Sequence, residues 1–253
     1  RTRLNHLRKR NDGNKMDTIT MKTNPLLRIR RLARRTAMEL SSMRIARMKR
    51  RILHKCAASE LPGGKTMVIA PHPDDEILGC GGLIAQKIAA GERVDVLFMT
   101  RGEKSYEFFN PLQSYNVAGI RTELAYRALS LLGLERTHVH WLGLKDTEIP
   151  APGATMFFDA VQALARRIID IRPDSLFIPH PLDVHRDHIH TNRLVEAAMR
   201  LDPSIRSLEL YCYPTWMLHA QHPRDLARKI RGNPFWIDIA PELPLKRDAI
   251  SLY

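Results

Sequence analysis

Two short apolar runs in this chain each end abruptly in a cluster of histidine and aspartate residues. The first run opens the segment 67–82, MVIAPHPDDEILGCGG, and the second opens the segment 175–190, SLFIPHPLDVHRDHIH. Each run has the length and composition of one buried strand. In open α/β sheets, sites form beyond the carboxyl ends of the strands. The sequence therefore predicts that the two polar clusters belong to a functional site.

The first cluster contains His72, Asp74, Asp75 and Glu76, with a proline on each side of the histidine. An acidic turn that caps the next helix would explain Asp75 or Glu76, because carboxylates stabilise helix N-termini. It would explain neither the histidine nor the two prolines, which restrict the backbone around it. We therefore interpret this cluster as metal-binding or catalytic.

The second cluster is richer in histidine, and taken alone it could be a polar surface loop. Its members are His180, Asp183, His185, Asp187, His188 and His190. Zinc binds imidazole nitrogen and carboxylate oxygen, and a catalytic zinc takes three protein ligands and keeps one position open. His72 and Asp75 together with one histidine of the second cluster would supply that set.

Apolar strands and amphipathic helices alternate from about residue 61 onward. We expect strands from 67 to the proline at 71 and at 93–99, 137–141, 173–179, 208–213 and 235–239. We expect helices at 83–90, 118–132, 157–170, 188–201 and 245–253. This alternation predicts an α/β fold, a Rossmann-like, doubly wound and mainly parallel sheet flanked by helices. The domain would span 61–253, preceded by an extension at 1–60.

The two motifs, HPDDE at 72–76 and HRDH at 185–188, resemble those of the LmbE-like or PIG-L family of zinc-dependent de-N-acetylases. The resemblance implies that His72, Asp75 and His188 bind Zn²⁺, with another divalent ion such as Fe²⁺ as the alternative. It also implies that Asp74 is the general base.

The same resemblance implies roles for the rest of the HRDH motif and for two residues outside both motifs. His185 would stabilise the oxyanion or donate a proton, and Asp187 would orient His185. Arg121 and Asp146 would bind substrate, although Arg121 could instead form a salt bridge within its helix. Arg101 departs from the Thr-Asp-Gly-like sequence of the family. It would either recognise an anionic substrate or be a solvated loop arginine.

The implied activity is removal of an N-acetyl group from an N-acetylglucosamine-type sugar or glycoconjugate, by metal-activated water. One alternative is an amidase that acts on a thiol conjugate or another small amide. A second alternative is a non-catalytic binding protein that acts through its basic N-terminus. The exact substrate and the oligomeric state are not predicted.

The positive charge of the chain is concentrated near its N-terminus. Of 40 Lys and Arg and 27 Asp and Glu, residues 1–55 hold 18 basic and 3 acidic residues, so the remainder carries a net charge of −2. Apolar residues recur at helical spacing among the arginines of 26–54, which predicts basic amphipathic helices. These helices would dock on the catalytic domain or, through residues 26–55, contact an anionic membrane. Without a recognised fold or interleaved aromatics, nucleic acid is the disfavoured partner.

No secretory signal and no membrane-spanning run is visible in the sequence. The three cysteines are widely spaced and form no CxxC motif, which fits a reducing compartment. We therefore expect a cytoplasmic protein, with peripheral membrane contact as an alternative. The last helix of the family usually continues into a Ser-Gln pair, so we expect this sequence to be shortened at its C-terminal end.

Overall fold

The computed structural model describes residues 43, 46–47, 50, 56–105, 116–217, 230 and 232–253. The chain divides into two compact units, Arg1–Arg50 and Arg51–Tyr253. In the first unit, the four described residues are helical. The rest of the basic segment predicted at 26–54 lies outside the described residues.

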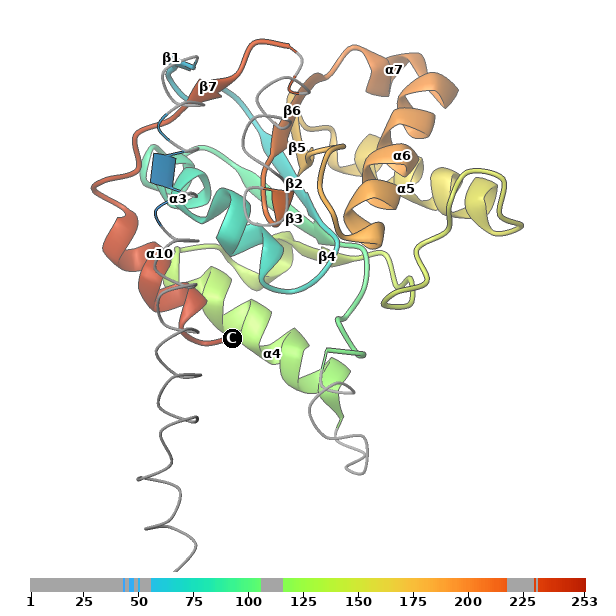
Figure 1. The fold of residues 1–253 in the computed structure, drawn as a ribbon, viewed down its shortest axis with the longest axis horizontal. Coiled ribbons are helices and arrows are strands. Elements are labelled where there is room, and N and C mark those ends of the chain that lie inside the picture. Colours follow the sequence, from blue (N-terminus) through green and yellow to red (C-terminus); the bar gives the residue numbers. More distant parts are fainter. Residues whose placement is uncertain are drawn as a thin grey trace, which may run out of the picture. The chain divides into compact units, whose positions relative to one another are not determined.

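The second unit is built on a five-stranded sheet (Figure 1). Its strands are β2 (Thr66–Ala70), β3 (Val94–Phe98), β4 (Val139–Trp141), β5 (Ser175–Pro179) and β6 (Glu209–Tyr213). The spatial order is β4-β3-β2-β5-β6, and every neighbouring pair is parallel. All residues of β2, β3 and β5 are buried, as expected for central parallel strands.

The strand order reverses between β2 and β5. From β2 the chain moves outward to β3 and β4, and it then returns to the other side of β2 with β5 and β6. Such a reversal is the topological switch point where sites form in doubly wound sheets. One cluster of histidine and aspartate residues follows each of these two strands, so the topology brings both clusters to the same edge of the sheet.

Helices cover both faces of the sheet. One face packs against α3 (Asp75–Ala89), α4 (Val117–Leu131) and α10 (Leu243–Ile250), and the other packs against α5 (Phe157–Ile171) and α6 (Arg186–Leu201). Successive strand residues point to opposite faces, so Val68 belongs to the first apolar core and Ile69 to the second. These three layers confirm the predicted α/β class.

Several elements differ from the sequence-based expectation. The strand expected at 235–239 is reduced to β7 (Phe235–Trp236), which pairs with β1 (Ala57–Ala58) in a separate two-stranded sheet. The 3₁₀ turn η1 (Arg136–His138) replaces the first two residues of the strand expected at 137–141, and β4 begins at Val139. The short helix α7 (Pro203–Arg206) was not expected. Within the described ranges, no helix has the length and apolarity needed to span a bilayer.

The first long helix begins eight residues earlier than expected, at Asp75 instead of residue 83. The helix contains glycines at 79, 81 and 82, although glycine disfavours helix interiors. Close packing explains one of them: a side chain at Gly79 would overlap the ring of Tyr213. Gly79 is therefore required by the contact of α3 with Tyr213 of β6. The HPDDE motif thus continues directly into α3, which begins at Asp75.

Candidate metal centre

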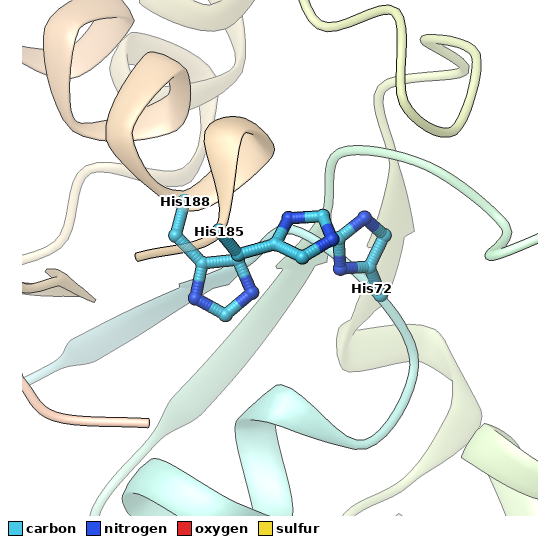
Figure 2. Close-up of side chains that lie close together, drawn as sticks. All are labelled: His72, His185 and His188. Atoms are coloured by element: carbon cyan, nitrogen blue, oxygen red, sulfur yellow. The ribbon is translucent and has the colours of Figure 1, made fainter. Parts of the chain in front are cut away.

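Three histidines that follow strands β2 and β5 in sequence lie close together (Figure 2). His72 follows β2, His185 is the N-cap residue of α6, and His188 lies in the first turn of that helix. The ring centre of His72 is 4.9 Å from that of His185 and 5.6 Å from that of His188. The fold thus unites residues that lie more than a hundred positions apart.

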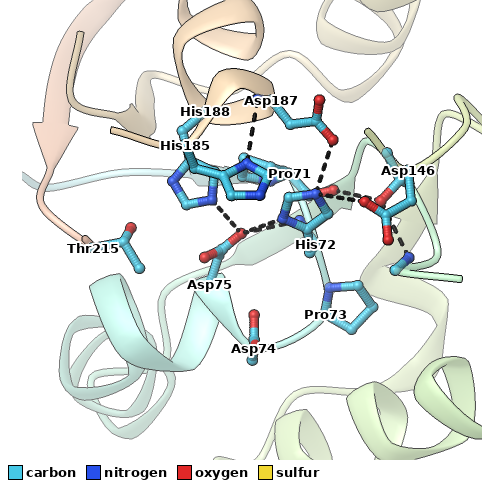
Figure 3. A network of polar contacts seen from close by, with 12 residues as sticks. Pro71, His72, Pro73, Asp74, Asp75, Asp146, His185, Asp187, His188 and Thr215 are labelled. Carbon is cyan, nitrogen blue, oxygen red and sulfur yellow. Dashed lines mark hydrogen bonds and ion pairs between the residues drawn. The ribbon is translucent and has the colours of Figure 1, made fainter. Parts of the chain in front are cut away.

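The three predicted metal ligands are in direct contact (Figure 3). The Oδ2 atom of Asp75 lies 3.3 Å from Nδ1 of His72 and 3.1 Å from Nε2 of His188. All three side chains are buried. Despite this proximity, Nε2 of His188 has no hydrogen-bond partner of acceptable geometry among the described residues. Two imidazole nitrogens that converge on one carboxylate oxygen form the donor set that zinc prefers, so these residues fit a divalent cation.

Asp183 fixes the orientation of the His188 ring. Its Oδ2 atom lies 3.3 Å from Nδ1 of His188 and accepts the backbone N–H groups of Thr215 and Trp216 at 3.3 and 3.2 Å. Because Nδ1 faces this acceptor, it carries the proton of the neutral ring and leaves the lone pair of Nε2 directed at Asp75. In sequence, Asp183 is recognisable as a member of the second cluster but not as the partner of His188.

The other nitrogen of His72 faces two further carboxylates. Its Nε2 atom lies 3.0 Å from Oδ2 of Asp187 and 3.1 Å from Oδ1 of Asp146. The side chains of Asp146 and Asp187 are buried, and the backbone N–H of Thr147 donates to Asp187 at 2.8 Å. These carboxylates orient His72 and stabilise its protonated nitrogen. These three groups lie close enough together to hold a cation, and so do His72, His185 and His188.

This arrangement differs from the expected pairing of Asp187 with His185. The ring of His185 caps α6 by accepting the backbone N–H of Asp187 at Nδ1, with a distance of 3.3 Å. The Asp187 carboxylate meanwhile reaches His72. The contact between these two residues therefore involves the backbone of Asp187, because His185 occupies the N-cap position and Asp187 lies in the first helical turn.

Asp74 precedes α3, but its side chain makes no capping hydrogen bond. Its Oδ2 atom lies 3.3 Å from Nη2 of Arg121, and the side chain remains 29% exposed. Burial and then the negative charge of Asp75 raise the pKa of Asp74 to about 6. Its carboxylate is thus accessible and basic enough to accept a proton near neutral pH.

The two arginines predicted to bind substrate have partners within the protein. Arg121 pairs with Asp74 and also donates to the carbonyl oxygen of Pro73. Arg101 donates to Oγ1 of Thr122 at 2.9 Å, and its guanidinium lies 4.8 Å from the ring centre of Trp141. Substrate contact by these arginines and by Asp146 stays a prediction.

Known proteins are similar to this chain in sequence. The PIG-L family, described as GlcNAc-PI de-N-acetylase, matches residues 67–199. A 1D-myo-inositol 2-acetamido-2-deoxy-alpha-D-glucopyranoside deacetylase of Mycobacterium sp. (strain KMS) is 29% identical over 153 residues, which cover 53% of this chain and 50% of that protein. A diacetylchitobiose deacetylase of Thermococcus kodakarensis is 28% identical over 137 residues, 51% of this chain and 47% of that protein. The chain thus spans about half the length of the curated relatives it matches.

Solved structures share the fold of this chain. A conserved protein from Thermus thermophilus superimposes with a TM-score of 0.55 and 28% identity, over 74% of this chain and 77% of that one. An N,N'-diacetylchitobiose deacetylase from Pyrococcus horikoshii shares the fold, with a TM-score of 0.52 and 24% identity, over 74% of this chain and 68% of the other. The family match covers both strand-end clusters, and the chain belongs to the PIG-L family.

Proposed function

We propose that the protein is a zinc-dependent hydrolase that removes the acetyl group from an N-acetylglucosamine-type sugar or glycoconjugate. The observation that carries this proposal is the contact of Asp75 with both His72 and His188, beside the accessible carboxylate of Asp74. The curated relatives are named as deacetylases of such sugars, which supports the substrate class.

The protein's own residues would hold the cation and keep its ligands in place. His72, Asp75 and His188 supply two neutral nitrogens and one carboxylate oxygen. When bound, a divalent cation supplies Lewis acidity, which polarises an amide carbonyl and makes water more acidic. In the neutral rings, Asp183 holds the proton of His188 on Nδ1, and Asp187 with Asp146 holds the proton of His72 on Nε2. The nitrogens that face Asp75 are then the ones available to the cation.

Asp74 would act as general base on the attacking water. With a pKa of about 6 it is mostly ionised at neutral pH, yet basic enough to take a proton in the transition state. It adjoins Asp75 in sequence, which places it beside the cation without adding it to the ligand set. Once protonated, Asp74 could return the proton to the departing amine.

His185 would donate a hydrogen bond to the oxyanion that forms during attack. Burial and then the neighbouring His72 and His188 lower the pKa of His185, which favours a neutral ring. Because Nδ1 accepts the backbone N–H of Asp187, the proton of the neutral ring sits on Nε2, which is then a donor. Removing a donor of this kind costs about 2.7–4 kcal/mol of transition-state stabilisation.

The test is acetate release from a panel of N-acetylated sugars, measured together with bound zinc. Asp74→Asn should keep one zinc per chain and lose activity by about 10²–10⁴-fold, the usual contribution of a general base. His188→Ala should lose zinc from this centre as well as activity. Asp170→Asn, an exposed substitution on α5, is the matched control. Full activity of both centre variants would refute the proposal.

We further propose that residues 26–55 bring a cytoplasmic enzyme into peripheral contact with anionic membranes. The support is the excess of arginine in this segment, since each basic residue near such a surface contributes about 1 kcal/mol. Replacing the arginines at 30, 31, 34 and 35 with glutamine should strongly reduce binding to phosphatidylserine vesicles while deacetylation of a soluble sugar continues. Unchanged vesicle binding would contradict this part of the proposal.

A further inference from the structure

The backbone of Asp74 adopts a conformation that residues with a side chain rarely take. Its φ is 125° and its ψ is −31°. A conformation of this kind costs about 1–3 kcal/mol and persists only where the surrounding structure imposes it. Because Asp74 lies directly before Asp75, its backbone angles determine where its carboxylate points relative to the metal ligands.

The buried side chain of Glu76 stabilises this backbone conformation through a hydrogen bond. The N–H of Asp74 donates to Oε2 of Glu76 at 2.9 Å, and Glu76 is completely buried. The carbonyl oxygen of Asp74 accepts the N–H groups of Ile77 and Leu78 at 3.1 and 2.9 Å, in the first turn of α3. Both peptide groups of Asp74 are thereby anchored, and Glu76 supplies the anchor that lies outside the helical pattern.

Glu76 is in turn held by Tyr253, which follows α10. The hydroxyl of Tyr253 donates to Oε1 of Glu76 at 2.6 Å. Lys246, within α10, donates to the carbonyl oxygen of Leu78 at 2.9 Å, so two side chains connect this region to the start of α3. A residue almost 180 positions away in sequence therefore acts on the peptide group of Asp74 through one intermediate side chain.

Arg121 supports the same residue from another side. Its guanidinium pairs with the Asp74 carboxylate, donates to the carbonyl oxygen of Pro73 and lies 6.0 Å from the ring centre of Tyr253. Gly102 makes room for it, because a Cβ atom there would overlap the Arg121 side chain. The contacts of Arg121 thus serve the position of Asp74, whatever contact it also makes with substrate.

We propose that Glu76 and Tyr253 are positioning residues, which hold Asp74 in its strained conformation and so aim its carboxylate at the attacking water. The proposal rests on the proposed function of Asp74 as general base. Neither side chain touches the reacting atoms. Their contribution is to make the strained conformation the stable one, with Glu76 accepting the N–H of Asp74 and Tyr253 fixing the Glu76 carboxylate.

The test compares three substitutions in the full chain. Tyr253→Phe removes only the hydroxyl, and Glu76→Ala removes the acceptor. Both should lower kcat by on the order of 10–100-fold, as expected for a misplaced catalytic group, with KM and bound zinc unchanged. Glu76→Gln keeps an oxygen for the N–H of Asp74 and should restore kcat to within a few-fold of the wild type. Tyr211→Phe removes a comparable 2.7 Å bond to Glu209 on the edge strand β6 and is the matched control.

The outcomes separate this proposal from the proposed function. If the wild-type protein releases acetate and Tyr253→Phe retains its full kcat, the positioning proposal is overturned while the function stands. A crystal structure of the Tyr253→Phe protein gives a second readout that needs no activity. Movement of Asp74 out of the positive-φ region, or of Glu76 away from the Asp74 N–H, supports the proposal. An unchanged Asp74 and Glu76 overturns it, even if the wild type is inactive on every sugar tried.

Discussion

Replacing Asp183 with asparagine should weaken metal binding while preserving the shape of the centre. The Asp183 side chain is fully buried, and its Oδ2 atom faces both Nδ1 of His188 and the backbone N–H of Trp216. Its Oδ1 atom accepts the N–H of Val184 at 2.7 Å. Asparagine has the same size but only one side-chain oxygen. Its NH₂ group must therefore face either the N–H of Val184 or the groups that now donate to Oδ2, which are His188 and Trp216. If it faces His188, the proton moves to Nε2 and blocks the nitrogen that faces Asp75.

The expected magnitude follows from the role of such orienting partners. Removing the hydrogen-bond partner of a ligand histidine lowers metal affinity by about 10–100-fold. This corresponds to about 1.4–2.8 kcal/mol of binding free energy. A zinc titration in competition with a fluorescent chelator measures it directly at neutral pH.

The control for this experiment is Asp202→Asn. Asp202 caps α7 by accepting the N–H of Ser204 at 2.8 Å, and asparagine caps helices equally well, so zinc affinity should not change. If Asp183→Asn binds zinc as tightly as the wild type, Asp183 does not orient His188. The assignment of the His188 proton to Nδ1 would then be wrong.

Two further predictions concern protons and packing. The pKa of His72 lies well above its ordinary value, and that of His188 is raised to about 9, since hydrogen bonds and facing carboxylates more than offset the effect of burial. Below that pH a cation must displace protons, so zinc affinity should rise by about tenfold per pH unit for each proton released; calorimetry that shows no pH dependence would contradict this. Gly79→Ala should destabilise the fold by about 1–3 kcal/mol in urea titrations, because the added methyl overlaps the buried Tyr213 ring. Gly63→Ala, where no atom lies within 4 Å, should change the free energy of unfolding far less, and equal effects of the two substitutions would refute the packing argument.

The sheet could be predicted because its strands are short, apolar and interrupted by amphipathic helices. Runs such as that ending at Ala70 are buried on both faces, so their sequence carries little ambiguity. The start of α3 was less predictable, because glycine at position 79 disfavours a helix. Its reason is a packing contact with Tyr213, which lies far along the chain and is not visible in the local sequence. Local propensity was overridden here by a tertiary contact.

The metal centre, like the fold, could be predicted from the sequence only in part. The clusters that contain His72 and His188 are recognisable in sequence because each follows an apolar strand. Parallel strands bring their carboxyl ends, and therefore both clusters, to the same edge of the sheet. The direction of an individual carboxylate is not recognisable in this way. That of Asp187 depends on where α6 begins and on His185 occupying its cap. The hydrogen bond of Tyr253 with Glu76 links distant positions and leaves no local pattern.

The most direct test of the central claim is a crystal structure of the zinc-loaded protein, with the ion located by its anomalous scattering. The account predicts one ion within about 2.0–2.2 Å of an imidazole nitrogen of His72, a carboxylate oxygen of Asp75 and Nε2 of His188. A zinc-loaded crystal without an ion at this place would contradict it. So would an ion bound by His72 with Asp146 and Asp187 while His188 has no bond to metal.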